Sequence, residues 1–515
     1  MPPELENLTE ALQRHLGVQQ AQSFEPENIT ADAIARLVDK RGDSDRLEQL
    51  WRSPDEAAQN LVEGDPTSAR EPLLALRKVL DSSLVVSRYA SGVPKSFLPF
   101  TPVFVRSRYA GSVYRDLGRS IVEGLWARPG LADTRNLIRE QVARWGTQHP
   151  LALLLAPLCR ERAGEKTKDK AQLAAALDAD ADLRAWADRV VVADWKAWVR
   201  AAPRLSVDEQ VETMTGLIGL HLHVALLWRL GDTVPLGSKT VREQRYPPLF
   251  FLAVEGQVGD TALASAASHA CLRAACNFLG FWRGRAYDAL ELVARQAVDQ
   301  AAGEDKTLRK ALAPADWTAP RVWLTIRIRG KRTERAQREF AELLEDKLRE
   351  QADTDRKPDP GTIRRLVVES LARPFSGDSL DKFKDFLRGT GRAAGIVGPN
   401  HPRSRRRYLL DERGLSLLAR LHTCRVPEEV QSDEEDRASV EAFLDDIFDR
   451  YGMIITTERS RVRERLTGSG PLRPLEALFP SEEAARRNRA VLDRRLDALR
   501  LVRRYSDASA VIRLP

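Results

Sequence analysis

A run of arginines near residue 405 has the residue types and spacing best suited to chemistry. Arg403 is followed by three consecutive arginines, Arg405, Arg406 and Arg407, and then by Tyr408. Guanidinium groups spaced this closely can neutralise successive phosphates and release their counterions. A neighbouring tyrosine ring can stack on a base or a sugar. We therefore expect this run to contact DNA.

The net charge of the chain is concentrated around this run. The 515 residues carry a formal net charge of +7. Residues 381–425 hold eleven basic and four acidic residues, so their excess of seven equals that of the whole chain. Concentrated positive charge is typical of polyanion binding, and we expect Arg388 and Arg392 to extend the basic surface.

Glycines precede the arginine run. Residues 389–395 read G-x-G-x-x-x-G, and two prolines follow before residue 403. This composition disfavours regular structure and predicts a flexible loop that brings backbone amides and Arg392 near a polyanion. A disordered surface loop without a function is the alternative.

A second group of arginines lies on the last predicted helix, over residues 482–499. Val491, Leu492, Leu496 and Leu499 share an inward face, which leaves the arginines mostly outward. Residues 501–505 and 510–514 then predict a β-hairpin. The arginines expected to read a groove or meet the DNA backbone from this helix are Arg486, Arg487, Arg494 and Arg495.

The elements predicted before this helix are a short strand and two helices. Tyr408–Leu410 predicts a short strand and residues 415–421 a helix. A second helix carries an apolar stripe and ends at Gly452, ahead of the β-prone residues 453–455; the stripe is Phe443, Leu444, Ile447, Phe448 and Tyr451. Helices, an arginine-faced helix and a terminal hairpin are typical of a winged helix. Because winged helices also dock on proteins, partner docking and a plain structural cap remain alternatives.

The rest of the chain is predicted to be mainly α-helical. We expect an N-terminal helical region (1–95), a helical scaffold domain (96–350), a linker (351–361) and the basic winged-helix-like, α+β module (362–515). The linker prediction rests on a polar stretch with two prolines. Residues 321–329 alternate between apolar and polar and predict either a half-buried strand or the start of a helix.

The sequence contains no local motif that indicates catalysis. No Walker A motif is present, and the S-x-x-K match at 379–382 lacks its companion motifs. The E-x-K match at 345–347 lies within a predicted helix, where a solvated charged face is the simpler interpretation. His221 and His223 point about 200° apart on a helix, so core or interface positions fit them better than a shared metal. We expect no cofactor, no metal and no enzymatic activity, with a nuclease site assembled from distant residues as the alternative.

Cysteine usage and hydropathy indicate the cytoplasm. The four cysteines are scattered, without a C-x-x-C pair, which fits a reducing compartment. The N-terminus is acidic and unlike a signal peptide, and the strongest apolar runs, such as 151–158, are too short to span a bilayer. We expect no membrane association.

Several C-terminal residues carry a resemblance to a known family. They are Arg405–Leu410, Phe443-Leu444, Asp449–Ile455, Asn488, Leu492, Arg495-Leu496, Leu499, Ser506–Ala508 and Val511. Their order, over about residues 390–515, resembles the C-terminus of accessory subunits in bacterial phage-defence operons, such as those of DNA-phosphorothioation-dependent restriction. The resemblance implies a DNA-binding or assembly subunit that works beside an ATPase, translocase or nuclease. The expected partners are double-stranded DNA and those subunits. A pure protein scaffold, whose basic segment docks on an acidic partner, is the alternative.

Overall fold

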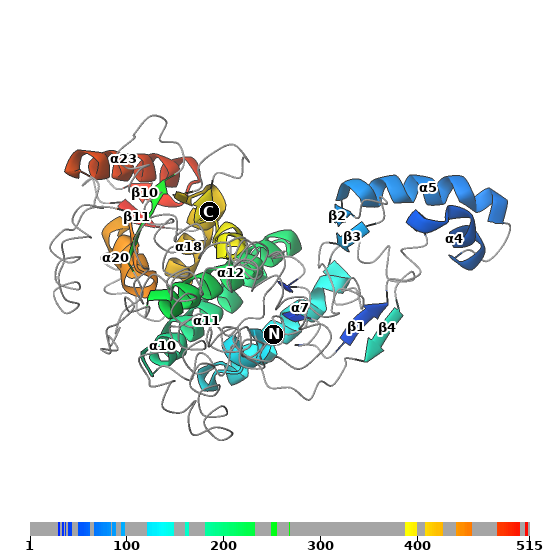
Figure 1. Cartoon of the computed structure of the whole chain (residues 1–515), viewed down its shortest axis with the longest axis horizontal. Coiled ribbons are helices and arrows are strands. Elements are labelled where there is room, and N and C mark those ends of the chain that lie inside the picture. The colour runs from blue at the N-terminus through cyan, green and yellow to red at the C-terminus, as the bar shows by residue number, and fades with distance from the viewer. Residues whose placement is uncertain are drawn as a thin grey trace, which may run out of the picture.

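The chain is seen in a computed structural model (Figure 1). It describes residues 29–30, 33–34, 37, 40–43, 50–61, 66–83, 85–88, 94–97, 121–148, 160–163, 181–231, 249–254, 267, 387–398, 407–425, 439–455, 481–504 and 510–512. These residues are mostly helical, as predicted. The expected strand or helix at 321–329 and the linker at 351–361 lie outside them.

The N-terminal part contains two packed helices and two small antiparallel strand pairs. Helix α4 (Pro54–Leu61) packs on α5 (Pro66–Ser83). Strand β1 (Lys40–Asp43) pairs with β4 (Arg160–Ala163), and β2 (Val85–Arg88) pairs with β3 (Pro94–Phe97). The indole Nε1 of Trp51, just before α4, donates to Asp81 Oδ1 of α5 at 2.7 Å and ties the segment that precedes α4 to α5.

A tryptophan-rich group of helices forms the middle of the described chain. It comprises η2 (Ile121–Leu125), η3 (Pro129–Leu131), α7 (Ala132–Gln148), α10 (Ala181–Trp186), η5 (Ala187–Val191), α11 (Val192–Ala201), η6 (Ala202–Arg204) and α12 (Val207–Gly231). Helix α12 begins with a capping box, in which Ser206 and Glu209 exchange hydrogen bonds between side chain and backbone N–H. Five tryptophans are fully buried here: Trp126, Trp145, Trp195, Trp198 and Trp228.

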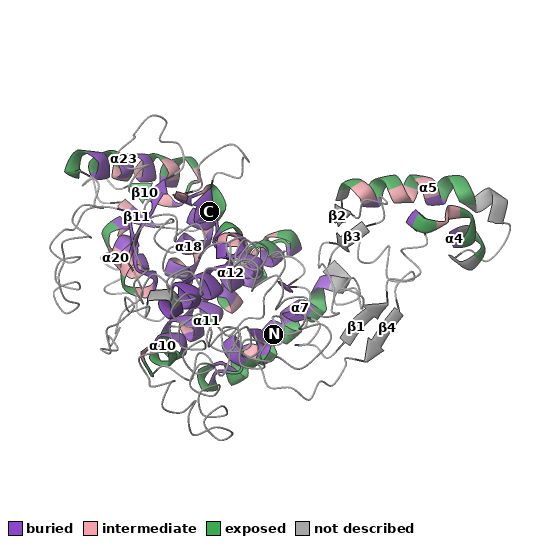
Figure 2. Ribbon diagram, in the orientation of Figure 1, coloured by how far each residue is buried: buried purple, intermediate pink, exposed green. Residues whose placement is uncertain are grey.

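Helix α12 is apolar on nearly all sides. Among the described residues it is the one helix long and apolar enough to cross a membrane, over Val207–Arg229. Most of it is buried against other parts of the chain (Figure 2). An all-round apolar helix enclosed in this way packs as a core helix of the described chain.

The C-terminal elements follow the predicted order. They are β7 (Val397–Gly398), β8 (Arg407–Leu410), α18 (Glu412–Arg425), α20 (Val440–Tyr451), β9 (Met453–Ile454), α23 (Glu482–Ala498), β10 (Val502–Arg504) and β11 (Ala510–Ile512). Ser439 and Ser481 cap α20 and α23, each accepting a backbone N–H three residues on. Gly452 ends α20 with φ 71°, the left-handed conformation that glycine adopts most easily. The helix at 440–451, the strand after it and the antiparallel hairpin β10–β11 confirm the sequence predictions.

Two strands from the middle of the chain pair with this C-terminal part. Strand β5 (Phe250–Phe251) runs parallel to β9, and β6 (Ala253–Val254) runs parallel to β8, which pairs with β7 on its other side. Residues from both sides of the predicted 351–361 linker therefore belong to one hydrophobic core. In its described residues, the expected scaffold is not independent of the expected C-terminal module.

The predicted loop at Gly389–Arg407 is wrong for its first part, because residues 387–393 are helical and β7 follows. The glycines serve close packing. A Cβ on Gly219 of α12 would lie 2.7 Å from both Ala393 Cβ and Thr390 O, and one on Gly391 would lie 2.4 Å from Val397. Gly395, at φ 68°, ends this segment against Gly414. Glycine here lets backbones approach, which composition alone cannot distinguish from glycine in a mobile loop.

Candidate functional site

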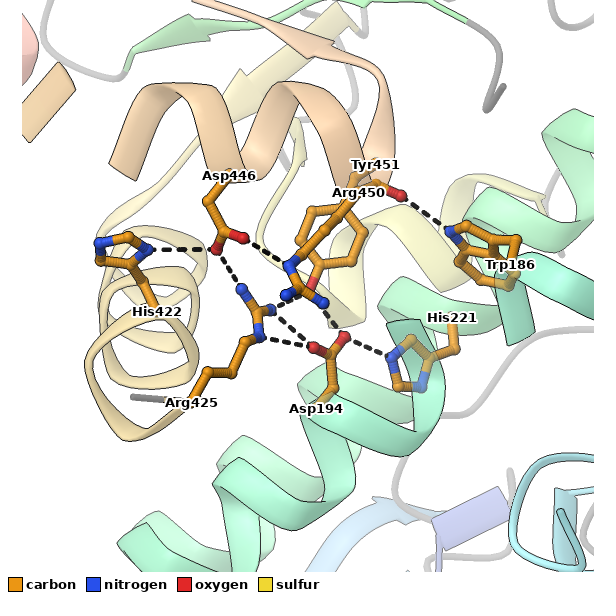
Figure 3. Close-up of polar contacts among 8 residues, drawn as sticks. All are labelled: Trp186, Asp194, His221, His422, Arg425, Asp446, Arg450 and Tyr451. Atoms are coloured by element: carbon orange, nitrogen blue, oxygen red, sulfur yellow. Dashed lines mark hydrogen bonds and ion pairs between the residues drawn. The ribbon is translucent and has the colours of Figure 1, made fainter. Parts of the chain in front are cut away.

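A buried ionic network joins four helices of the core (Figure 3). Its centre is the Asp194 carboxylate on α11, which is fully buried. Arg425, the last residue of α18, reaches Asp194 Oδ1 with Nη2 at 2.6 Å. His221 Nε2 of α12 lies 2.8 Å from Asp194 Oδ2, and the Tyr451 hydroxyl of α20 donates to the same oxygen at 2.6 Å. Three donors from three other helices thus converge on one carboxylate.

Asp446 forms the second anionic centre of the network, one turn before Tyr451 on α20. It accepts from Arg425 and from Arg450, and His422 Nδ1 lies 3.2 Å from Oδ2. Arg425 therefore bridges two carboxylates, one on α11 and one on α20. The Trp186 indole donates to the Arg450 carbonyl at 2.8 Å and adds a tie between α10 and α20.

The electrostatics follow from this arrangement. Burial alone would raise the pKa of Asp194, but Arg425, His221 and Tyr451 together hold that pKa below its usual value. For Asp446, the same opposing effect of burial is outweighed by His422, Arg425 and Arg450, so its pKa is also lowered. Burial raises the pKa of Tyr451 well above 10, and this hydroxyl stays protonated and donates. Both carboxylates are therefore ionised at neutral pH.

The network is arranged for structure more than for catalysis. Asp194 and His221 are fully buried. Asp194 Oδ1 contacts both Nε and Nη2 of Arg425, and Oδ2 contacts His221 and Tyr451, so each oxygen has two partners. A general base needs a free lone pair within reach of a substrate proton, and this carboxylate presents none. Within the described ranges, no group of three His, Cys, Asp or Glu residues is placed to hold a metal ion. The network clamps α11, α12, α18 and α20 together.

A second buried cluster lies on the other side of α12. His223 Nδ1 donates to the Leu387 carbonyl at 3.1 Å, and its Nε2 accepts from the Tyr408 hydroxyl at 3.1 Å. Both bonds suit a neutral ring, and burial lowers the pKa of His223 to about 4. The expectation that Tyr408 stacks on a base is corrected here, because its ring is 1% exposed and contacts Phe250. As predicted, His221 and His223 are core histidines that face opposite ways.

Three of the four arginines expected on the outer face of the last helix are exposed. Asn488 fixes the inner face, because its side-chain amide bonds the backbone of Val254, Leu252 and Ile455. Arg486, Arg487 and Arg494 are exposed. Figure 2 shows α23 with exposed residues along its length beside the buried ones. Arg486 and Arg487 form i,i+4 pairs with Glu482 and Glu483, whereas Arg495 is half-buried and pairs with Glu412 at 2.5 Å; these three acidic residues lie on α23 and α18.

The other arginines predicted to contact DNA differ in how exposed they are, and several lie outside the described residues. Arg392 is exposed and Arg388 is half-buried. Arg407 is partly enclosed, and its buried Nε has no hydrogen-bond partner among the residues that the structure describes. Arg403, Arg405 and Arg406 lie outside the described residues. Of the predicted contacts on α23, Arg486, Arg487 and Arg494 are exposed and Arg495 is not. Of the arginine run near 405, only Arg407 lies within the described residues, and it is partly enclosed.

Sequence reasoning did not find the ionic network. Its members are separated by up to 264 residues, as in the Trp186–Arg450 bond. One signal was present, because Asp194 stands among alanines and tryptophans on a helix, where a carboxylate requires a buried partner. The identity of that partner could not be read from the chain.

Comparisons with known proteins add no identification. No protein-family model matches the chain, and neither a curated protein nor a solved structure matches it.

Proposed function

We propose that this protein binds the backbone of double-stranded DNA through the arginine face of α23, as a non-catalytic subunit of a larger assembly. The observation that carries the proposal is the separation of the two faces of α23. One face is fixed to the core by Asn488, and the other presents Arg486, Arg487 and Arg494 to solvent. A cationic face on a rigid element is what sequence-independent phosphate binding requires.

The acidic neighbours of these arginines do not prevent this role. The Arg486–Glu482 and Arg487–Glu483 contacts are 3.8 and 3.4 Å long, between exposed side chains. Exposed pairs of this kind contribute about 0–1 kcal/mol, so exchanging them for phosphate contacts costs little. The acids reduce the local charge, and we therefore expect moderate, salt-sensitive affinity.

The order of the C-terminal elements supports a winged-helix-like docking mode. Helices α18, α20 and α23 are followed by the β10–β11 hairpin. In our proposal α23 takes the role of the helix that enters the major groove. The resemblance to phage-defence accessory subunits supports a place beside a partner ATPase, translocase or nuclease, which would perform the enzymatic work. An acidic protein partner for the same face is the rival that the experiment must separate from DNA.

The test is a salt titration of duplex binding by the full chain and by a triple variant, Arg486→Ala, Arg487→Ala and Arg494→Ala. Each lost phosphate contact removes about 0.9 from the slope of log affinity against log salt. We expect the triple variant to bind about tenfold or more weakly, with a slope reduced by about 2–3.

A matched control removes three exposed arginines elsewhere, at Arg70, Arg189 and Arg204. This control should keep the wild-type affinity and slope. Equal losses in both triple variants would show that only the overall charge matters, and unchanged binding by the α23 variant would overturn the proposal.

A further inference from the structure

The positive charge of the α23 region is concentrated at one end. Residues 481–493 contain three arginines and three acidic residues, and are neutral in sum. Residues 494–504 contain five arginines and one aspartate. The basic half is therefore the C-terminal end of α23 together with β10.

Two arginines of this half have no carboxylate partner among the described residues. Arg504 pairs with Asp497 and Arg495 with Glu412. Arg494 donates only to the Ala490 carbonyl, at 3.3 Å. Arg500 is exposed, and its side chain makes no hydrogen bond or ion pair within the described part of the chain. Arg494 and Arg500 are thus the cations most available to an external anion.

Arg500 also has an unusual backbone conformation. Its φ is 55°, and it is the one non-glycine residue with positive φ in the described ranges. The turn is a Schellman motif, in which Leu501 N–H bonds Leu496 O at 2.8 Å and Arg500 N–H bonds Asp497 O at 3.0 Å. Glycine is the usual residue at this position, because any Cβ crowds the backbone in the left-handed region. An arginine here makes the turn less stable than a glycine would.

The simplest structural use of this arginine is already supplied by another residue. A cation near a helix C-terminus is stabilised by the exposed carbonyls of the last turn. Arg495 lies in the last turn of α23 and fills that role. An arginine in a strained position, exposed and unpaired, is better explained by a contact outside the chain.

We propose that Arg500 contacts a phosphate of duplex DNA, so that the principal grip on the backbone lies where α23 meets β10, at Arg494 and Arg500. This inference rests on the proposed function and assigns its main DNA contact to Arg494 and Arg500. It also predicts that replacing Arg500 with glycine raises stability but weakens DNA binding. The same is not expected for arginines in the N-terminal half of α23.

The experiment compares Arg500→Gly and Arg500→Lys with the wild-type full chain, using a duplex oligonucleotide at several salt concentrations and urea denaturation. Arg500→Gly relieves the strain, so its unfolding equilibrium constant should fall about fivefold. Its duplex affinity should fall severalfold, and the salt slope should decrease by about 0.9. Arg500→Lys keeps both the strain and the charge, and should retain the wild-type stability and slope.

The outcomes separate this inference from the proposed function. If Arg500→Gly binds with wild-type affinity and slope while the Arg486/Arg487/Arg494 triple variant is impaired, the proposed function holds and this inference fails. If Arg500→Gly is less stable than the wild type, the strain argument fails. If the wild type shows no salt-dependent binding to duplex DNA, both fail.

Discussion

Replacing Arg425 with methionine is the sharpest perturbation of the fold. Among the described residues, Arg425 is the one side chain that contacts both Asp194 and Asp446, and its own side chain is 8% exposed. Methionine fills a similar volume but leaves Asp194 without its cation. Removing one partner of a buried ion pair destabilises by about 3–5 kcal/mol, because the remaining charge stays desolvated. We expect Arg425→Met to lose this amount of unfolding free energy.

The assay is equilibrium urea unfolding at pH 7, followed by tryptophan fluorescence and circular dichroism. The matched control is Arg413→Met on the same helix, since Arg413 is 53% exposed and its contact to Glu212 is 3.9 Å long. Exposed pairs contribute about 0–1 kcal/mol, so this control should stay close to the wild type. Arg425→Lys keeps the charge without the planar fork and should fall between the two variants.

The pH dependence adds an independent check. In the wild type the pKa of Asp194 is lowered, so its contribution to stability is present above its unfolded pKa near 4 and is lost as pH falls further. In Arg425→Met, burial is opposed less strongly and the folded pKa of Asp194 rises. Protonation then relieves the buried charge, and the stability deficit of the variant should shrink between pH 7 and pH 4.5. A loss of unfolding free energy below about 1 kcal/mol at pH 7 in Arg425→Met would show that the Asp194–Arg425–Asp446 network does not hold the helices together. A loss that does not shrink in acid would show the same.

Two further predictions concern the other buried polar groups. Burial lowers the pKa of His223 from its usual 6.5 to about 4, so its contribution is complete above pH 6.5 and is lost as pH falls towards 4. This amounts to about 3 kcal/mol, and His223→Gln should flatten the dependence of unfolding free energy on pH over that range, whereas an unchanged slope would show that the ring is not held neutral. Asn488→Ala leaves the Val254 N–H and the Leu252 and Ile455 carbonyls without their partner, so urea unfolding should show a loss of about 3 kcal/mol. The exposed neighbour Arg487→Ala is the control, and equal stability of the two variants would show that α23 is not fixed through Asn488.

Local patterns predicted the C-terminal elements well. The stripe from Phe443 to Tyr451 and the glycine after it define α20 and its end, because helical periodicity and the left-handed cap are both local properties. The α23 helix and the hairpin were predicted for the same reason. The arginine face of α23 also followed from periodicity alone.

Long-range features could not be predicted from one sequence. Strands β5 and β6 are two residues long and pair with strands roughly 150–200 positions away, so neither carries a recognisable pattern of its own. The glycines near 391 were interpreted as a loop, because the residues they pack against, such as His223 for Gly391, include positions on a distant helix. Tyr408 was assigned to DNA for a similar reason, since the histidine that accepts the hydrogen bond of its hydroxyl is 185 residues away.

The buried polar residues hold the helices in place, and the exposed arginines of α23 form the surface proposed to bind DNA. Asp194, Arg425 and Asp446 hold α11, α18 and α20 in place, while Asn488 holds α23 against β6 and β9. Rigid support of this kind is what allows exposed side chains on a helix to present a fixed surface to a partner.

The affinity of the wild-type full chain for a duplex oligonucleotide, measured by fluorescence anisotropy from 50 to 300 mM salt, tests the central claim most directly. Binding through Arg486, Arg487, Arg494 and Arg500 predicts a linear fall of log affinity with log salt and a slope of about −3 to −4, independent of the duplex sequence. Undetectable binding at 50 mM salt, or binding with no salt dependence, would contradict the account.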